Sequence, residues 1–589
     1  MMRTRPGTSG SDTAEPLEWV VFPAHADEDP GRELIGGKAW SLWRMNQLGL
    51  RVPPSFVVTT RACTAYFDQD KSLPDGLVDE LRTGIRALEA ELGRTFGGTE
   101  RPLLVSVRSG AAVSMPGMMD TILNLGINDD IERALAVETR MPEFAAEVNR
   151  RFHAFYGQLV LGCFEELGDL PDTAAVRAAI SEETTGTVPT DPWAQLEAAV
   201  GAVFASSRTR RAMAYREHHG IPHDLGTAVT VQAMVFGNAD DRSGTGVLFS
   251  RNPLSGSPEV YGEYLPCGQG EDVVSGKVSP LPLDMLAERS PTIHAELIEA
   301  ADLLDREGRD AQDIEFTVEC GTLYLLQSRP AKRTARAAVR IALELVDEGV
   351  IDIGEALARV TPDQLRAVLR PVVASGATDG ATALASGSSA SPGVATGLAV
   401  ATPEEAEQVP GSILVRRTTS PEDVHGMIAA AAVVTELGGS TSHAAVVSRA
   451  LDTPCVVGCD GALEKLVGKV VTVDASAGVV YAGELPTVAV DENDDPDLVR
   501  ILAWAAERSP ITVVPTTGEA PEPLLDVTAD PELDPETVPP IPEGTASVHG
   551  PCFGTPEGLR AALAAGVHTL VADPALPVLL TALNLKETS

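Results

Sequence analysis

Apolar residues recur with two different periods along the chain, and these periods predict the order of its secondary structure. Short runs rich in β-branched residues predict strands over residues 103–110, 227–237, 243–253, 261–274, 312–319 and 323–329. Helical spacing of apolar residues runs through 128–220, and the aromatic residues of 143–161 fall on one helix face, which is typical of a core-facing helix. Residues 335–370 are also predicted to be helical. Together these runs predict a multidomain chain of the α+β and α/β classes.

The length of the chain and its composition along the sequence predict several domains. At 589 residues it exceeds what one hydrophobic core usually supports, so two to four domains are expected. A stretch rich in Gly, Ser and Ala predicts a flexible linker at 371–389. The linker separates a first domain at 1–370 from a compact β/α domain at 390–484. The remaining segment, 485–589, begins acidic and Pro-rich and ends in a small α/β cap.

In that cap, one helix has clear signals at both ends. Thr555 is a good N-cap residue, Pro556 suits the first helical position, and Gly566 follows the last turn. A short apolar run lies on each side of this helix. The cap is therefore predicted to be a small strand and helix unit, and it shows no constellation of catalytic residues.

Residues 438–450 place one histidine, His443, where a glycine-rich loop leads into a helix. The apolar residues 427–435 predict a buried strand that two glycines interrupt, and the hydroxyl residues 440–442 can cap the helix that follows. Backbone N–H groups at such a helix start stabilise negative charge, which favours a phosphoryl group on the histidine. A core histidine in an α/β turn explains the same spacing, and spacing alone does not separate the two interpretations.

The N-terminal half offers candidate contacts for a phosphoryl donor. Lys38 follows two glycines at a predicted helix start, where close backbone approach and one cation suit a polyphosphate. The strand at 103–110 delivers Arg108 to a loop at 111–121 that is rich in Gly, Pro and Met and can serve as a lid over a nucleotide. A solvated helix-start lysine and a Met-rich core turn are the structural alternatives.

Two later strands carry polar residues at alternate positions. Asp313 and Glu315 share one face of the first strand, and Gln327 and Arg329 share one face of the second. Carboxylate, amide and guanidinium groups on adjacent strands can hold Mg²⁺ against the phosphates of ATP. The solvated face of an antiparallel sheet is the alternative for each pair taken alone.

Charge and cysteine usage exclude several function classes. The net charge of −39 argues against nonspecific binding to nucleic acid or to an anionic membrane surface. The sequence has no apolar run of 18 residues and no signal-peptide apolar region near its N-terminus, so we expect a soluble, cytoplasmic protein without membrane partners. Seven scattered cysteines without zinc-like pairs fit a reducing compartment.

The motif Gly-Gly-Ser-Thr-Ser-His-Ala-Ala at 438–445 resembles the phosphohistidine motif of the swivelling domain in the pyruvate, phosphate dikinase family. Pyruvate–water dikinases usually have Cys at the position of Ser442, so the motif favours the phosphate-dependent enzymes. Ser440 departs from the methionine common in that family. The resemblance implies that His443 is the catalytic nucleophile and that Thr441 is a site of regulatory phosphorylation.

The motifs from about residue 33 to 334 resemble the ATP-grasp domain of the same family, with a helical insert at about 128–220. The resemblance implies that Lys38, Arg108 and Arg329 bind ATP phosphates, with Arg329 also acting at the transferred group. It further implies a set of nucleotide and metal contacts with distinct roles. These are Glu315 and Gln327 for Mg²⁺ and ATP, Glu271 and Asp313 at the nucleotide site, and Gln232, Met234 and Val235 along the adenine.

The implied reaction uses ATP and phosphate, phosphorylates the histidine and releases AMP and diphosphate. A pyruvate-binding TIM barrel takes about 250 residues, more than follow residue 484, so we expect a separate barrel protein to handle pyruvate and phosphoenolpyruvate. An oligomer is compatible with this arrangement. The alternatives are a dikinase for another acceptor, either water or an antibiotic, and a non-catalytic ATP-binding regulatory module.

Overall fold

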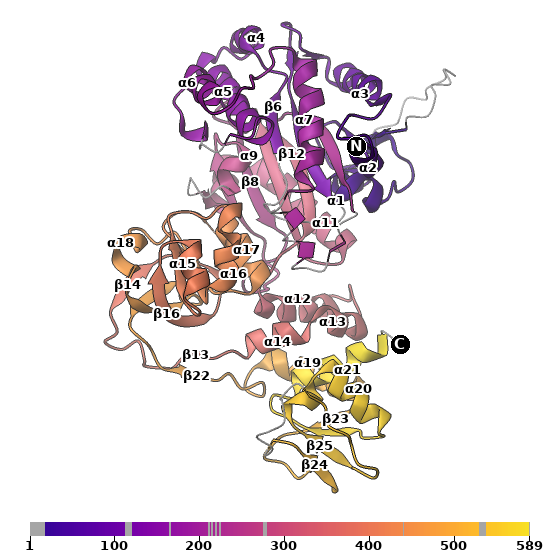
Figure 1. Cartoon of the computed structure of the whole chain (residues 1–589), viewed down its shortest axis with the longest axis vertical. Coiled ribbons are helices and arrows are strands. Elements are labelled where there is room, and N and C mark those ends of the chain that lie inside the picture. Colours follow the sequence, from indigo (N-terminus) through magenta and orange to yellow (C-terminus); the bar gives the residue numbers. More distant parts are fainter. Residues whose placement is uncertain are drawn as a thin grey trace. The chain divides into compact units, whose positions relative to one another are not determined.

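The computed structural model describes residues 18–111, 121–163, 167–209, 212–213, 216–217, 221–222, 225–274, 280–439, 441–528 and 537–587 (Figure 1). The chain divides into two units, each described here by itself: Met1–Val235 with Tyr324–Gln327, and Phe236–Leu323 with Ser328–Ser589. This division falls inside the segment 1–370, which the sequence predicts as one ATP-binding domain. The predicted domain boundaries therefore remain predictions.

The first unit contains an antiparallel five-stranded sheet. In spatial order its strands are β1 (Val20–Val21), β2 (Ser55–Val58), β7 (Thr227–Ala233), β5 (Val105–Ala111) and β6 (Thr121–Leu125). Every residue of β7 is buried, because strands pair with it on both sides and three helices pack against it. Those helices are α1 (Arg32–Gln47), α2 (Thr60–Asp68) and α7 (Pro192–Ser206). The strands predicted at 103–110 and 227–237 are confirmed, with β7 ending four residues early.

The segment 128–220 contains several helices, as the sequence predicts. α4 (Asp129–Thr139), α5 (Pro142–Leu159) and α6 (Thr173–Glu183) form a group beside β6 (Figure 1). The aromatic face of α5 is buried, with Phe152 and Tyr156 inaccessible to solvent. The first unit also contains α3 (Leu77–Leu92) and the paired strands β3 (Thr95–Phe96) and β4 (Pro102–Leu103).

The second unit begins with another antiparallel sheet. Its order is β10 (Leu281–Pro282), β9 (Tyr261–Pro266), β8 (Gly244–Phe249), β11 (Gln312–Glu319) and β12 (Thr322–Pro330). Of β12, residues Tyr324–Gln327 are counted with the first unit. The strand predicted over 261–274 is wrong in its second half, because β9 stops at Pro266 and Gly270–Val274 forms helix α9. The chain changes direction at Cys267, which has left-handed backbone geometry (φ 53°), and a Cβ on the next residue, Gly268, would lie 2.4 Å from the Leu265 side chain. Helices α10 (Asp284–Arg289) and α11 (Pro291–Gly308) follow.

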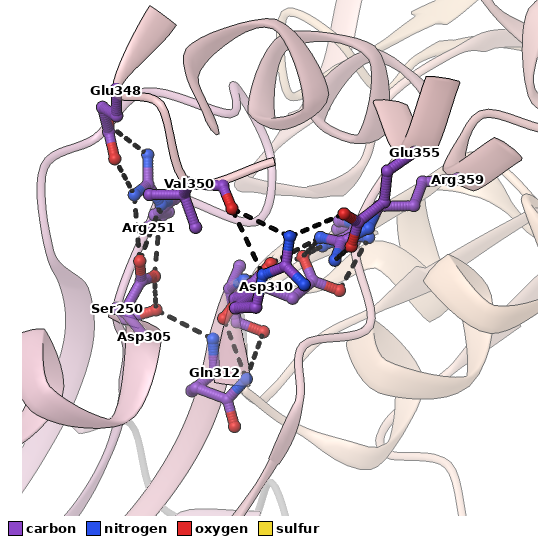
Figure 2. Close-up of polar contacts among 12 residues, drawn as sticks. Ser250, Arg251, Asp305, Asp310, Gln312, Glu348, Val350, Glu355 and Arg359 are labelled. Carbon is purple, nitrogen blue, oxygen red and sulfur yellow. Dashed lines mark hydrogen bonds and ion pairs between the residues drawn. The ribbon is translucent and has the colours of Figure 1, made fainter. Parts of the chain in front are cut away.

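A buried ion-pair cluster, which we call the Arg251 clamp, ties this sheet to the helices that follow it (Figure 2). Arg251 lies two residues after β8 and donates to Asp305 on α11 at 2.9 to 3.3 Å. It also donates to Glu348, the C-cap residue of α12 (Ala335–Asp347), at 2.7 and 2.8 Å. The Ser250 hydroxyl donates to Asp305 at 2.6 Å. Three elements distant in sequence are thereby held at one buried guanidinium.

A second polar group next to the clamp involves α13 (Ile353–Arg359) (Figure 2). Glu355 accepts from Arg359 at 2.6 Å and from Arg309 at 2.7 Å, and Arg309 also donates to the carbonyl of Val350. Helix α14 (Pro362–Val368) ends the helical segment predicted at 335–370. The helices that leave the sheet are thus anchored to it by charged groups.

Residues 383–482, here called the histidine domain, form an eight-stranded sheet. Its order is β14 (Ala383–Ser386), β21 (Val479–Ala482), β20 (Val470–Asp474), β16 (Val394–Val400), β17 (Ile413–Arg416), β18 (Ala432–Thr435), β19 (Cys455–Val457) and β15 (Ser388–Ser391). The strands β16 to β19 are parallel to one another, and the other pairings are antiparallel. β14 and β15 lie at opposite ends of this order, yet only Gly387 separates them in sequence. The sheet therefore curves until its two edges meet.

The structure corrects two predictions for this domain. The segment 371–389 is not an unstructured linker throughout, because β14 and β15 occupy 383–391 and pair with β21 and β19. Small Ser, Gly and Ala residues are compatible with these tight edge pairings. The buried strand predicted at 427–435 is only β18, since Val424–Ala429 forms helix α16. The capped turn at Ser420–Asp423 starts that helix and places its apolar residues against the core.

The C-terminal part forms a parallel four-stranded sheet with three helices. The strand order is β23 (Thr512–Val514), β26 (Thr569–Val571), β25 (Ser547–His549) and β24 (Leu524–Asp526). The predicted cap helix is confirmed as α20 (Pro556–Ala564), with the Thr555 hydroxyl as its N-cap. α19 (Pro496–Arg508) and α21 (Leu576–Glu587) pack with α12 in one apolar core. The linker strands β13 (Val372–Val373) and β22 (Thr487–Val488) pair with each other.

Candidate active site

His443 is the first residue of α17 (His443–Leu451), directly after the glycine loop that follows β18. Ser442 has extended backbone geometry, and its hydroxyl accepts from the N–H of Ala445 at 3.4 Å. This confirms the predicted N-cap, while Ser440 lies outside the described residues. The histidine is thus located where backbone N–H groups of a nine-residue helix begin. Such a position suits an anionic group on the imidazole.

A second polar contact to the histidine comes from elsewhere in the histidine domain. Oγ1 of Thr419 lies 3.1 Å from Nδ1 of His443, and Thr419 is buried in the loop after β17. The sequence analysis did not identify Thr419. The only sequence signal was a run of hydroxyl residues before Pro421, which marks a turn but no contact with a residue 24 positions away.

Strand β9 contacts the loop that leads to His443. The Glu263 carboxylate accepts from the backbone N–H of Thr441 at 3.2 Å and from the Thr441 hydroxyl. A Cβ on Gly439 would lie 2.6 Å from Oε1 of Glu263, so the loop approaches this carboxylate closely because residue 439 is glycine. The sequence predicted β9 as a strand but gave Glu263 no role.

Asp313 on β11 organises the guanidinium of Arg329. Its Oδ2 accepts from Nε and from Nη2 of Arg329, each at 2.9 Å, and Asp313 is 4% exposed. Burial raises the pKa of the Asp313 carboxyl, and the Arg329 charge opposes that rise. Asp313 in turn raises the pKa of Arg329. The pair therefore holds Arg329 as a fixed cation.

Arg449 connects α17 to the same part of the second unit. Its Nη1 donates to the carbonyl of Ala390 at 3.0 Å, and its guanidinium carbon lies 5.9 Å from the ring centroid of Phe249 on β8. Burial lowers the pKa of Arg449, while Asp313 and Glu263 act in the opposite direction by their negative charge. Arg449 was not recognised in the sequence, where it lies among small residues of the motif helix.

Glu315 lies on the same strand as Asp313, two residues along, and is partly exposed. The two carboxylates are close enough for the charge of Glu315 to raise the pKa of Asp313 further. Oδ1 of Asp313 is buried without a hydrogen-bond partner among the described residues. Oxygen atoms of this kind are the ligands that Mg²⁺ accepts. The predicted common face of Asp313 and Glu315 is therefore consistent with the structure.

Lys38 lies in the first unit, shortly after a kink at Gly36 in α1. Gly36 has φ 76° and ψ 161°, which divides the helix, and a Cβ there would lie 2.1 Å from the carbonyl oxygen of Gly110 at the end of β5. Glycine is therefore required for α1 to pack against β5. Lys38 follows this kink directly, as the sequence predicted for a helix start.

The other predicted contacts of the first unit lie on β5, on β7 and just after β7. Nη1 of Arg108 donates to Oε1 of Gln232 at 3.3 Å, and Nε2 of Gln232 donates to the carbonyl of Pro53. The backbone N–H of Met234 donates to Leu104, so this group already has an acceptor within the protein. Val235 is partly exposed.

Three predicted features remain without a structural test. Gln327 is buried on β12 and belongs to the first unit, whereas Glu315 belongs to the second. Glu271 lies on α9, but its side chain is outside the described residues, as is most of the lid predicted at 111–121.

Over the residues that the structure does describe, no helix has the length and apolarity needed to cross a bilayer.

Comparisons with known proteins match two regions of the chain. The family described as pyruvate phosphate dikinase, AMP/ATP-binding domain, matches residues 32–300. The family described as PEP-utilising enzyme, mobile domain, matches residues 408–478, which include His443 and Thr419. Two solved structures match short parts of the chain. Aconitase X of Thermococcus kodakaraensis is 23% identical over 17% of this chain and 98% of that chain, with a TM-score of 0.14. Enzyme I is 22% identical over 18% of this chain and 38% of that chain, with a TM-score of 0.12.

Curated relatives extend the match to most of the chain. Pyruvate, phosphate dikinase of Rhizobium meliloti is 43% identical over 542 residues, covering 83% of this chain and 60% of that protein. The Clostridium symbiosum enzyme of the same name is 41% identical, covering 84% and 61%, and the chloroplastic enzyme 1 of Zea mays is 41% identical, covering 84% and 56%. The chain thus spans about 60% of the length of these relatives. The resemblance stated from the sequence is confirmed: the chain carries the AMP/ATP-binding domain of pyruvate, phosphate dikinases, followed by the mobile domain of PEP-utilising enzymes.

Proposed function

We propose that this chain performs the ATP-dependent part of the pyruvate, phosphate dikinase reaction, in which ATP phosphorylates His443. Phosphate is the co-substrate, and AMP and diphosphate are released. The observation that carries the proposal is a pair of contacts that the loop before His443 and helix α17 make with the sheet of the second unit. Glu263 on β9 accepts from Thr441 in that loop, and the Arg449 guanidinium on α17 lies over the ring of Phe249 on β8, in the sheet whose Asp313 holds Arg329. The carrier histidine and the proposed catalytic arginine are thereby tied to one sheet.

Arg329 is proposed to stabilise charge on the transferred phosphoryl group. The guanidinium of Arg329 donates to Asp313 through Nε and contacts the same carboxylate through Nη2, which fixes it before the substrate binds, so little reorganisation is needed during the reaction. Its remaining N–H groups can bind phosphate oxygens in a forked geometry that lysine cannot reproduce. In the first unit we propose that Lys38 and Arg108 bind other phosphate oxygens of ATP.

Magnesium is proposed to accompany ATP, with Glu315 as its protein ligand. No group of three or more acidic, His or Cys side chains able to hold a metal occurs in the described ranges. Mg²⁺ is commonly held by one or two carboxylates together with substrate phosphates, and Glu315 would supply such a carboxylate. Bound Mg²⁺ would neutralise phosphate charge. The proposal that Gln327 also contributes rests on the resemblance.

The direct test is self-labelling. Incubation of the purified chain with Mg²⁺, phosphate and β-labelled ATP should give an acid-labile, base-stable label on His443. The variant His443→Ala should remain unlabelled. His425→Ala removes an exposed histidine of the same domain and serves as the matched control, which should label normally. Equal labelling of the His443→Ala chain would reject His443 as the nucleophile.

The final acceptor is proposed to be pyruvate, as in the names of the relatives. The comparisons find a PEP-utilising mobile domain in this chain and give no support to a separate barrel protein, so we do not propose one. Adding pyruvate to the labelled protein tests the acceptor. Transfer of the label to phosphoenolpyruvate is expected, whereas transfer to water or to an antibiotic would identify a different dikinase.

Regulatory phosphorylation of Thr441 is a further proposal carried over from the resemblance. Its side chain is 2% exposed and its hydroxyl donates to Glu263. A modifying enzyme can reach this hydroxyl only after the contact with β9 has opened. Glu263→Ala should therefore increase the rate of Thr441 modification.

A further inference from the structure

A carboxylate and a histidine meet at one edge of the C-terminal sheet of β23 to β26. Asp526 and His549 are the last residues of the adjacent parallel strands β24 and β25, and the register pairs them with each other. Nδ1 of His549 lies 3.3 Å from Oδ2 of Asp526, and the two side chains are 24% and 42% exposed. In open parallel α/β sheets, ligands bind outside the carboxyl ends of the strands. The pair therefore lies where such a sheet offers a site.

We propose that His549 is a second phosphoryl acceptor and that Asp526 activates it. The donor is phosphorylated His443, so the inference rests on the proposed function and goes beyond it by adding a site. The pair lies outside both regions that the family models match, residues 32–300 and 408–478. The sequence predicted no constellation of catalytic residues in this cap, because only strand pairing brings Asp526 and His549 together.

Asp526 is held in place by its own turn. Its Oδ1 accepts from the backbone N–H of Thr528 at 2.9 Å and from the Thr528 hydroxyl at 2.7 Å. These bonds, together with His549, keep the pKa of the Asp526 carboxyl below its ordinary value. The carboxylate is therefore ionised at neutral pH and can only accept hydrogen bonds. Its other oxygen, Oδ2, is the one that faces Nδ1 of His549.

A partner that can only accept decides where the imidazole carries its proton. Nδ1 of His549 has to carry the proton that is donated to Asp526, so in the neutral ring the lone pair is on Nε2. The side chain is partly exposed, so the ring is open to a donor group. Enzymes use a histidine oriented by a carboxylate in this way as a base or a nucleophile.

The turn after β25 holds His549 at the edge of the sheet. The backbone carbonyl of His549 accepts from the N–H of Val527 at 3.0 Å. A Cβ on the next residue, Gly550, would lie 2.3 Å from Cγ2 of Val527, so glycine lets the chain turn this close to the end of β24. An imidazole carried on a fixed strand end needs little reordering before it reacts.

A second histidine near the same sheet lacks this arrangement. His568 directly precedes β26, at the opposite edge of the sheet, and its Nδ1 lies 3.2 Å from the carbonyl oxygen of Pro510. A neutral carbonyl orients an imidazole but brings no negative charge. Asp526 does bring one, and it stabilises the positive charge that phosphorylation of Nε2 places on the ring of His549. His568 is exposed, so accessibility alone does not distinguish the two histidines.

The proposed transfer conserves atoms and charge. The Nε2–P bond on His549 forms while the N–P bond on His443 breaks, and the released imidazole keeps the electron pair. One phosphorus–nitrogen bond replaces another, so the step needs no oxidant, no reductant and no further co-substrate. Nδ1 of His549 keeps its proton and continues to donate to Asp526.

The experiment uses the full chain with two phosphoryl donors. Labelled ATP, given with Mg²⁺ and phosphate, loads His443 enzymatically, whereas phosphoramidate phosphorylates histidine side chains directly. Mass spectrometry of peptides kept at alkaline pH locates each phosphohistidine. The test variants are His443→Ala, His549→Gln and Asp526→Asn, and His568→Gln is the matched control.

With ATP, the unmodified chain and His568→Gln should carry label on His443 and then on His549, whereas His549→Gln should carry it on His443 alone. His443→Ala should take no label from ATP, yet phosphoramidate should modify its His549 about tenfold faster than its His568. Asp526→Asn should slow labelling of His549 about tenfold with either donor, the effect of losing one charge-assisted hydrogen bond.

Label confined to His443 in the unmodified chain would overturn the proposal. So would equal reaction of His549 and His568 with phosphoramidate, or an unchanged rate at His549 in Asp526→Asn. A chain whose His443 never takes label from ATP would instead reject the proposed function. The phosphoramidate reaction does not depend on ATP, so it would still decide whether Asp526 activates His549.

Discussion

Replacing Arg251 by methionine should loosen the junction between the sheet of the second unit and α12. Arg251 and Asp305 are 7% and 8% exposed, and the arginine makes close contacts with both Asp305 and Glu348. Removing the guanidinium leaves the Asp305 carboxylate buried with only the Ser250 hydroxyl as a strong donor. Breaking a buried ion pair in this way costs about 3 to 5 kcal/mol. Glu348 is 39% exposed, so Glu348→Gln should cost no more than about 1 kcal/mol.

Hydrogen exchange measured by mass spectrometry suits this prediction, because a chain with several domains does not unfold in one step. Peptides from α12 and β8 should lose about a hundredfold or more of their protection in Arg251→Met, with peptides of the first unit unchanged. The double variant Arg251→Met with Asp305→Leu should recover part of the protection, because it removes the isolated charge. Unchanged α12 protection in Arg251→Met, or an equal loss in Glu348→Gln, would refute the reasoning.

Three further predictions concern the site and the pH response. Glu263→Ala removes the carboxylate that accepts two hydrogen bonds from the loop before His443, so single-turnover labelling should slow about tenfold or more. Glu259→Ala changes an exposed glutamate and should leave the labelling rate unchanged. Equal labelling rates in the two variants would exclude a docking role for Glu263. Arg329→Lys should keep ATP affinity in equilibrium binding but slow labelling, and an unchanged rate would count against guanidinium geometry at the transferred group. Burial lowers the pKa of His153 to about 4, below its ordinary value of 6.5, so the folded state resists protonation and stability should fall as pH drops from 6.5 towards 4. At pH 5 the free energy of unfolding, measured by hydrogen exchange of α5, should be about 2 kcal/mol lower than at neutral pH. His153→Gln should abolish this pH dependence. A pH dependence that persists in the variant would show that another group causes it.

Much of the local structure was predictable because its causes lie within a few residues. The Ser442 and Thr555 caps each involve a hydroxyl and an N–H three positions later, so the residue types alone indicate them. The burial of Phe152 and Tyr156 follows from helical periodicity. The boundaries were less accurate where composition was ambiguous. Ser- and Gly-rich residues at 383–391 form strands because their partners β21 and β19 are supplied by the fold.

The site itself was only half predictable from the sequence. His443, Arg329 and Asp313 were named because motifs and strand alternation place them in recognisable patterns. Arg449 was missed since its role depends on which surface its helix faces. The pairing of Asp313 with Arg329 was not predicted either, although both lie on strands assigned correctly from the sequence, because a common face does not specify which groups bond.

By itself the sequence determined much of the secondary structure, the identity of the phosphohistidine motif and the family to which its two matched regions point. Only the tertiary structure decided which side chains contact that motif. Thr419 is 24 residues from His443, Glu263 is 178 residues from Thr441, and Arg251 is 97 residues from Glu348. Periodicity and capping are set by interactions between near neighbours along the chain. Contacts over such separations exist only after strand order and sheet curvature have brought distant segments together, so no local pattern records them.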